Sequence, residues 1–142
     1  TVREGDAAIV EQFVDLYKKT LNDANTALAD SIWQPGPKTS MVHPRGEDIG
    51  WENIRQHFYI DRLQKLYTER HFEFCDLDIE VYRDTAIAIY TWNFHGKLRS
   101  DGTEIEHKGR TSQTYRRMSQ EGWKILHAHI SGMPIANERQ PF

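Results

Sequence analysis

The sequence predicts an α+β fold in one domain, residues 1–142, in which N-terminal helices pack against a curved, mostly antiparallel sheet. Apolar residues recur at the spacing of helices as far as about residue 66. From about residue 71 they follow the alternation of strands, with turn residues at 100–102 and 120–122. Helices followed by a run of strands are typical of one sheet covered by helices.

Three helices are expected. The first covers about residues 6–21, with Asp6 as its N-cap and one apolar stripe. The second is short and ends near residue 32, before the firm break of Pro35-Gly-Pro37. The third begins at Gly50 and keeps its apolar side chains on roughly one side as far as residue 66.

The strands follow from alternation and from chain breakers. A short strand over residues 39–43 is stopped by Pro44. Four longer strands follow from about residue 72, and a phase slip between Phe74 and Cys75 predicts a bulge in the first of them. Residues 85–95 are apolar at almost every position, which indicates a strand covered on both faces. We expect a partner subunit to supply the second cover.

Composition excludes several classes of protein. The net charge of −3 and the pI of about 6.1 argue against nucleic-acid binding. No apolar run approaches the roughly 18 residues that a membrane span needs, so no membrane partner is expected. The single cysteine, Cys75, fits a reducing, cytoplasmic compartment. Because the chain starts at Thr1 without methionine, a removed N-terminal signal stays open.

The most distinctive motif is Trp123-Lys-Ile-Leu-His127-Ala-His129-Ile-Ser131-Gly132-Met-Pro134, near the end of the chain. Together with Phe58-Tyr-Ile-Asp61 and Ala88-Ile-Tyr90, it resembles the nuclear transport factor 2-like (NTF2-like) superfamily. That group includes ketosteroid isomerases, SnoaL-like polyketide cyclases and, closest to this chain, the association (hub) domain of calcium/calmodulin-dependent protein kinase II. The resemblance implies a cone-like, cystatin-like roll around one pocket, and a homodimer or a higher oligomer.

The same resemblance implies two candidate catalytic residues. Ketosteroid isomerases carry a catalytic tyrosine four residues before a Leu-Asn pair, and Tyr17 stands in that relation to Leu21-Asn22. Their general base lies directly before a proline, where this chain has His43 before Pro44. His43 could therefore act as a base near neutral pH and Tyr17 as an oxyanion donor. The alternative is that Tyr17 is a core residue and that His43 only ends a strand.

Three further residues are implied as ligand-binding positions. Gln113 corresponds to the second oxyanion donor of the isomerases, Trp92 to a pocket arginine of the hub domain and Ile130 to the last pocket position. Trp92 would offer a flat apolar wall, whereas a core or interface role is its alternative. Since the chain departs from the isomerase pattern at two of three catalytic positions, steroid isomerisation by that mechanism is not expected.

The pair His127 and His129 suggests a metal site because alternate strand residues point the same way. Zinc needs at least a third protein ligand, and none has a recognisable spacing, so we expect no metal. The alternation instead places one set of side chains toward the cone, namely Leu126, Ala128 and Ile130. It places the other set outward, toward a subunit contact: Ile125, His127, His129 and Ser131.

Two functions of different class remain open. One is a module that binds a small ligand or mediates oligomerisation, as the hub resemblance implies. The other is a small-molecule isomerase, lyase or cyclase with His43 as base and Tyr17 as oxyanion donor. In both, the partners are a second copy of the chain and a small hydrophobic or carboxylate-bearing ligand. No phosphate-binding glycine loop or serine-hydrolase motif is visible, and no cofactor is expected.

Overall fold

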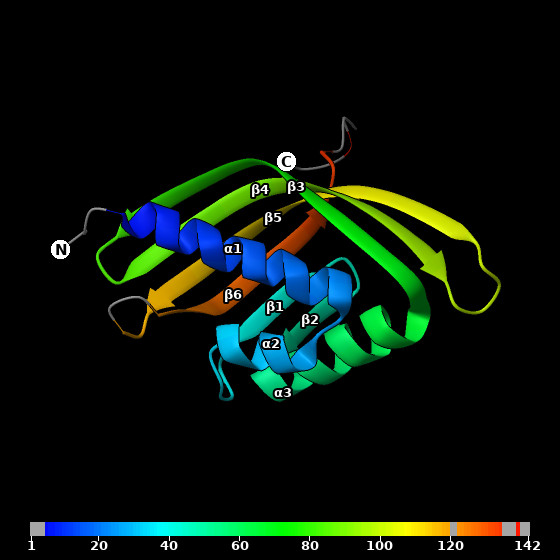
Figure 1. Cartoon of the computed structure of the whole chain (residues 1–142), viewed down its shortest axis with the longest axis horizontal. Helices are drawn as coiled ribbons and strands as arrows, with labels where there is room; N and C mark the ends of the chain where they lie inside the picture. Colours follow the sequence, from blue (N-terminus) through cyan, green and yellow to red (C-terminus); the bar gives the residue numbers. More distant parts are fainter. Residues whose placement is uncertain (1–4, 120–121, 135–138, 140–142) are drawn as a thin grey trace.

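The computed structural model describes residues 5–119, 122–134 and 139, which form one six-stranded curved sheet with helices on its concave side (Figure 1). The strands run in the order β2-β1-β6-β5-β4-β3. The ladder between β1 and β6 is parallel and the other four are antiparallel. The predicted α+β fold with a mostly antiparallel sheet is confirmed. None of the described helices is long and apolar enough to cross a membrane.

The sheet consists of two short strands and four long ones. Their bounds are β1 Ser40–His43, β2 Gly46–Ile49, β3 Tyr67–Tyr82, β4 Thr85–Leu98, β5 Glu104–Arg117 and β6 Trp123–Gly132. The expected turn near residues 100–102 joins β4 to β5, with Gly102 at a φ of 75°. Residues 120 and 121 of the second expected turn lie outside the described residues.

Helix α1 (Asp6–Asp23) crosses the concave face of the sheet, as Figure 1 shows. Its buried stripe includes Val10, Val14 and Tyr17. The N-cap residue is Gly5, so the expectation that Asp6 caps the helix is wrong. Asp6 is instead the first helical residue. Its carboxylate accepts hydrogen bonds of 3.0 and 2.7 Å from the Arg117 guanidinium, because β5 ends beside the helix.

The second layer of helices lies below α1 in Figure 1. Helix α2 (Thr26–Ile32) is capped by Asn25, whose side chain accepts a hydrogen bond from the backbone N–H of Leu28. The expected third helix begins after Gly50 as α3 (Trp51–Asn53) and continues as a π-helix, η1 (Ile54–Gln64). Its position was predicted from the sequence, but its winding was not. In a π-helix each N–H bonds five residues back, and such segments often mark functional sites.

The β1–β2 hairpin was not predicted. Pro44 and Arg45 form a two-residue turn, after which β2 pairs with β1 so that Met41 faces Asp48 and His43 faces Gly46. Cross-strand partners share a face of the sheet, and so do alternate residues of one strand. His43 and Asp48 are therefore diagonal neighbours on the inner face.

Three register shifts interrupt the described long strands, the first of them between Tyr67 and Glu69 at the start of β3. In β3 the register shifts between Cys75 and Asp78, close to the predicted slip. In β6 the register shifts opposite Thr114 and Tyr115, which leaves Leu126 as the extra residue. A bulge residue moves all side chains before it to the other face. Ile125 consequently lies fully buried in the core, so the expected inward Leu126 and outward Ile125 are wrong.

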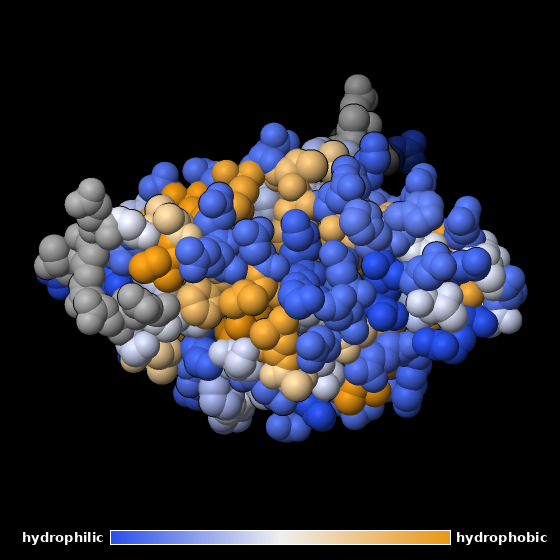
Figure 2. Space-filling model, in the orientation of Figure 1, coloured by the Kyte–Doolittle hydropathy of each residue, from blue (hydrophilic) through white to orange (hydrophobic). Residues whose placement is uncertain are grey.

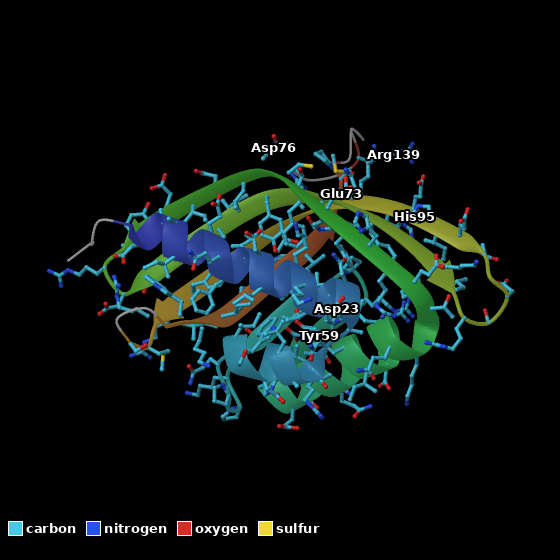
Figure 3. All side chains as sticks on the ribbon, viewed as in Figure 1. Asp23, Tyr59, Glu73, Asp76, His95 and Arg139 are labelled. Carbon is cyan, nitrogen blue, oxygen red and sulfur yellow. The ribbon has the colours of Figure 1, made fainter. Side chains whose placement is uncertain are left out.

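Aromatic side chains hold the layers together. Figure 3 shows Tyr59 of η1 between α1 and α2. Its hydroxyl lies 2.8 Å from the Thr20 hydroxyl of α1 and accepts a hydrogen bond of 3.0 Å from the Trp33 indole. The Trp33 ring stacks on Trp51 with centroids 5.6 Å apart. This network fixes η1 relative to α1. The exterior seen in Figure 2 is largely hydrophilic, with an apolar patch near its centre.

Candidate functional site

A cavity of about 700 Å³ opens between the inner face of the sheet, α1 and η1. Its wall is mostly apolar and rich in aromatic rings, which come from η1, β3 and β4: Phe58, Phe72, Phe74, Trp92 and Phe94. Its size and lining are those of a small-molecule pocket with a few polar groups. Most of its polar and charged lining residues come from the β1–β2 hairpin, η1 and β5.

The structure brings four of the five expected site residues to this cavity. Tyr17, His43, Trp92 and Ile130 all line it. Gln113 does not line it, although its side chain is buried. It lies one inward position deeper along β5 than Thr111, which does reach the cavity. The Gln113 carbonyl oxygen accepts a hydrogen bond of 3.0 Å from the Tyr115 hydroxyl.

Asp48 joins two histidines at the cavity wall. Its Oδ2 lies 2.9 Å from Nε2 of His43, and its Oδ1 lies 2.7 Å from Nδ1 of His57. The Asp48 residue is only 8% exposed, and all three residues line the cavity. The β1–β2 hairpin supplies His43 and Asp48, whereas η1 supplies His57 across the cavity wall. Both oxygens of this carboxylate are therefore occupied by imidazole rings.

The two imidazoles differ in which nitrogen stays available. The backbone N–H of Arg45 donates to Nδ1 of His43 at 3.3 Å, so Nδ1 is the acceptor and Nε2 donates to Asp48. Both nitrogens of His43 are thus engaged. His57 donates from Nδ1 to Asp48, and its Nε2 has no hydrogen-bond partner among the described residues. A histidine oriented by a carboxylate through one nitrogen and open at the other has the geometry of a general base.

Tyr17 adds an unpartnered donor to the cavity. Its side chain is 1% exposed, and no described residue hydrogen-bonds its hydroxyl. Burial raises the pKa of the Tyr17 hydroxyl well above its usual value, and the nearby Tyr59 and Tyr115 raise this pKa further. The hydroxyl therefore stays protonated and is a buried donor in the cavity wall, without a partner in the described part of the chain.

Trp92 contributes a second buried donor. Its indole nitrogen has no partner within the described part of the chain. The ring lies over Gly109 of β5, where an added Cβ would collide with Trp92 ring atoms and with the backbone oxygen of Ser131. Glycine at this position is thus required for the ring to lie against the sheet. The ring also contacts Phe72 edge-on at 5.9 Å between centroids.

His127 and His129 lie away from this cavity. His127 pairs with Thr114 across the β5–β6 ladder, and its Nδ1 lies 2.8 Å from the Ser40 hydroxyl. His129 is exposed. The described residues contain no group of three or more His, Cys, Asp or Glu arranged to hold a metal ion.

Sequence reasoning missed Asp48 and His57. One signal was available: Pro44-Arg45 can form a two-residue turn, which would place Asp48 on the same face as His43. No comparable signal marks His57, because a regular α-helical reading does not reveal the winding of η1.

The chain matches the family model described as a SnoaL-like domain over residues 10–136. It is similar to the solved structure of an NTF2-like superfamily protein from Salmonella enterica subsp. enterica serovar Typhimurium str. LT2, with a TM-score of 0.89, 28% identity and 94% of each chain covered. No curated protein matches it.

Two more distant structures share the fold. The CaMKII hub of S. rosetta has a TM-score of 0.75 at 18% identity, covering 93% of this chain and 100% of that one. The hexachlorocyclohexane dehydrochlorinase LinA-type3 from Novosphingobium barchaimii LL02 has a TM-score of 0.74 at 16% identity, covering 91% of this chain and 89% of that one. The family match spans most of the chain and confirms the resemblance of the closing motif. The protein belongs to the SnoaL-like family of NTF2-like domains.

Proposed function

We propose that this protein binds a small carbonyl compound in the cavity and removes a proton from the carbon beside its carbonyl, as an isomerase or a lyase. The observation that carries the proposal is the Asp48–His57 pair at the wall of an apolar cavity, in which no described residue hydrogen-bonds Nε2 of His57. The His57 side chain is 54% exposed, and a ligand bound against the aromatic wall would exclude water from Nε2. A base covered in this way suits proton abstraction from carbon, because each electrostatic interaction is stronger without water.

Each polar residue has a defined part in this reaction. Nε2 of His57 takes the proton, and the Asp48 carboxylate stabilises the imidazolium that forms. Negative charge develops on the carbonyl oxygen, where the unpartnered Tyr17 hydroxyl donates. His43 holds the second oxygen of Asp48. The proton then returns to a different carbon in an isomerase, or leaves with the departing group in a lyase.

This assignment gives the base role to His57 in place of His43, the residue expected from the sequence. The reason is that His43 has no nitrogen left to accept a proton while it donates to Asp48 and accepts from Arg45. One structural neighbour is a dehydrochlorinase, so this fold can carry an elimination reaction. The support is limited to the fold, which does not by itself imply a function.

The direct test is deuterium incorporation. Purified protein in D₂O would be incubated with a panel of aryl ketones and cyclic enones, and exchange at the carbon next to the carbonyl would be followed by NMR. We expect exchange that is lost in His57→Gln. The matched control is His71→Gln, since His71 also pairs with a carboxylate, that of Glu73, but lies outside this cavity. Equal exchange by His57→Gln and wild type would refute the proposal.

A second proposal concerns assembly, and an exposed apolar face favours it. On the outer side of β4, Ile87 and Ile89 are 39% and 51% exposed. We propose that this face forms a homodimer contact, because exposed aliphatic side chains on a sheet commonly mark an interface. Light scattering would report a dimer for the wild type and a monomer for an Ile87→Glu, Ile89→Glu double variant. A monomeric wild type would rule the contact out.

A further inference from the structure

The winding of η1 places an arginine beside the proposed base. His57 and Arg62 are five residues apart in this π-helix, and both line the cavity. Phe58 and Leu63 form the adjacent row and line it as well. In an α-helix, residues five apart would lie about 140° apart around the axis and could not share a face. The π-helical winding therefore brings the imidazole and the guanidinium to one wall, about one turn apart.

The cavity has an excess of positive charge. Arg45 and Arg62 both line it, and neither forms an ion pair with a described residue. The Asp48 carboxylate is already bonded to two histidines. Glu47 and Lys108 also line the cavity, both exposed, so three cationic side chains stand there against the two carboxylates of Glu47 and Asp48.

Arg62 is the stronger anion-binding candidate of the two arginines. It is half-buried beside the apolar wall, whereas Arg45 is exposed on the hairpin turn. A guanidinium that is partly removed from water without a counter-ion is unfavourable, and a bound anion would relieve that cost. Its planar fork matches the two oxygens of a carboxylate.

We infer that the substrate is an amphipathic carboxylic acid, an inference that rests on the proposed function. Its carboxylate binds Arg62, its apolar body lies against the aromatic wall, and its carbonyl oxygen accepts from Tyr17. One helical turn is roughly 5 Å, so the carbon that gives its proton to His57 is about two or three bonds from the carboxylate. A single half-buried guanidinium suits this monoanion better than a phosphate dianion.

The test uses one acid and its neutral counterpart. The probes are 4-oxo-4-phenylbutanoate, which carries an acidic C–H between ketone and carboxylate, and its carboxamide. Calorimetric titration would measure their affinities for wild type, Arg62→Gln and the control Arg110→Gln. Arg110 is exposed on β5 and does not line the cavity. We expect the acid to bind at least about tenfold more tightly than the amide, as a charge-assisted hydrogen bond would give.

The Arg62→Gln variant should lose this preference, and Arg110→Gln should keep it. Circular dichroism melting checks that both variants are folded. His57→Gln should bind the acid as wild type does while losing deuterium exchange, so binding and proton transfer are measured separately.

The outcomes separate this inference from the proposed function. Three results would overturn the substrate class: equal affinity for acid and amide, failure of the acid to bind, or a preference for the acid that survives Arg62→Gln. If deuterium exchange still depended on His57, the proposed function would stand. Conversely, the preference for the acid could depend on Arg62 while deuterium exchange survives His57→Gln. That result would support the anion site and reject His57 as the base. Phenyl phosphate that binds through Arg62 more tightly than the acid would also overturn the carboxylate assignment.

Discussion

Nδ1 of His57, on η1, lies 2.7 Å from Oδ1 of Asp48, on the β1–β2 hairpin. This contact orients one imidazole, while the second carboxylate oxygen engages His43. The two histidines are therefore unequal: Nε2 of His57 has no partner among the described residues, whereas both nitrogens of His43 are engaged. Substitutions at the two positions should distinguish a base from a residue that positions the carboxylate.

His57→Gln should lower the rate of deuterium exchange by about 10²–10⁴-fold, the usual contribution of a general base. His43→Gln should have a smaller effect, because the glutamine amide can still donate to Asp48. The measurement is the exchange rate of each variant at saturating probe. A larger loss in His43→Gln than in His57→Gln would return the base role to His43.

Tyr17→Phe should raise the free energy of unfolding and lower activity at the same time. Deleting a buried hydroxyl that has no partner among the described residues removes a desolvation cost of about 1 kcal/mol or more. Losing an oxyanion donor should slow exchange by about 10²-fold. Urea unfolding and the exchange assay measure the two effects.

Tyr115→Phe is the matched control for this substitution. The Tyr115 hydroxyl is equally buried but donates to Gln113, so its removal strands a buried acceptor and should lower the free energy of unfolding by about 1–3 kcal/mol. If Tyr17→Phe and Tyr115→Phe destabilised the protein alike, the Tyr17 hydroxyl would not be an unsatisfied group awaiting a ligand.

The fold was predictable because its signals are local and repeated. The stripe of α1 and the alternation of the long strands each extend over many residues, so single irregularities do not hide them. β2 was missed because Gly46–Ile49 is four residues long with one large apolar side chain. The Leu126 bulge was missed because Ile125 and Leu126 are both apolar. Either residue could face the core, so the alternation alone does not show where the register shifts.

The candidate site was predictable only in part, for a related reason. Tyr17 and His43 were identified because the residues that follow them, Leu21-Asn22 and Pro44, resemble those that follow the catalytic residues of ketosteroid isomerases. Asp48 and His57 acquire their roles from a hairpin register and from π-helical winding, both of which are set by packing against the rest of the chain. Gln113 was expected at the cavity, yet it lies just beyond its deep end.

Asp6→Ala should destabilise the protein more than Asp84→Ala. Both carboxylates contact Arg117, but the Asp6 side chain is buried and receives two hydrogen bonds, whereas that of Asp84 is exposed. Without Asp6, the buried Arg117 guanidinium would keep only the exposed Asp84 carboxylate as a counter-ion among the described residues, whereas loss of the exposed pair costs little. Thermal melting should show a clear decrease for Asp6→Ala and almost none for Asp84→Ala. Equal decreases would mean that the buried pair contributes no more than a surface contact.

Stability should decrease in mildly acidic solution because of His127. Burial, with a smaller contribution from the nearby His129, lowers the pKa of His127 below its usual 6.5. Between the lowered pKa and 6.5, the unfolded chain binds a proton that the folded chain does not, so the free energy of unfolding falls as the pH falls through that range. Above 6.5 both states are neutral at this residue and the contribution is constant. His127→Gln should flatten this part of the profile in urea unfolding, while the glutamine amide can still hydrogen-bond the Ser40 hydroxyl. His129→Gln should flatten it only slightly, since desolvation is the larger cause, and an unchanged slope in His127→Gln would assign the proton uptake to another group.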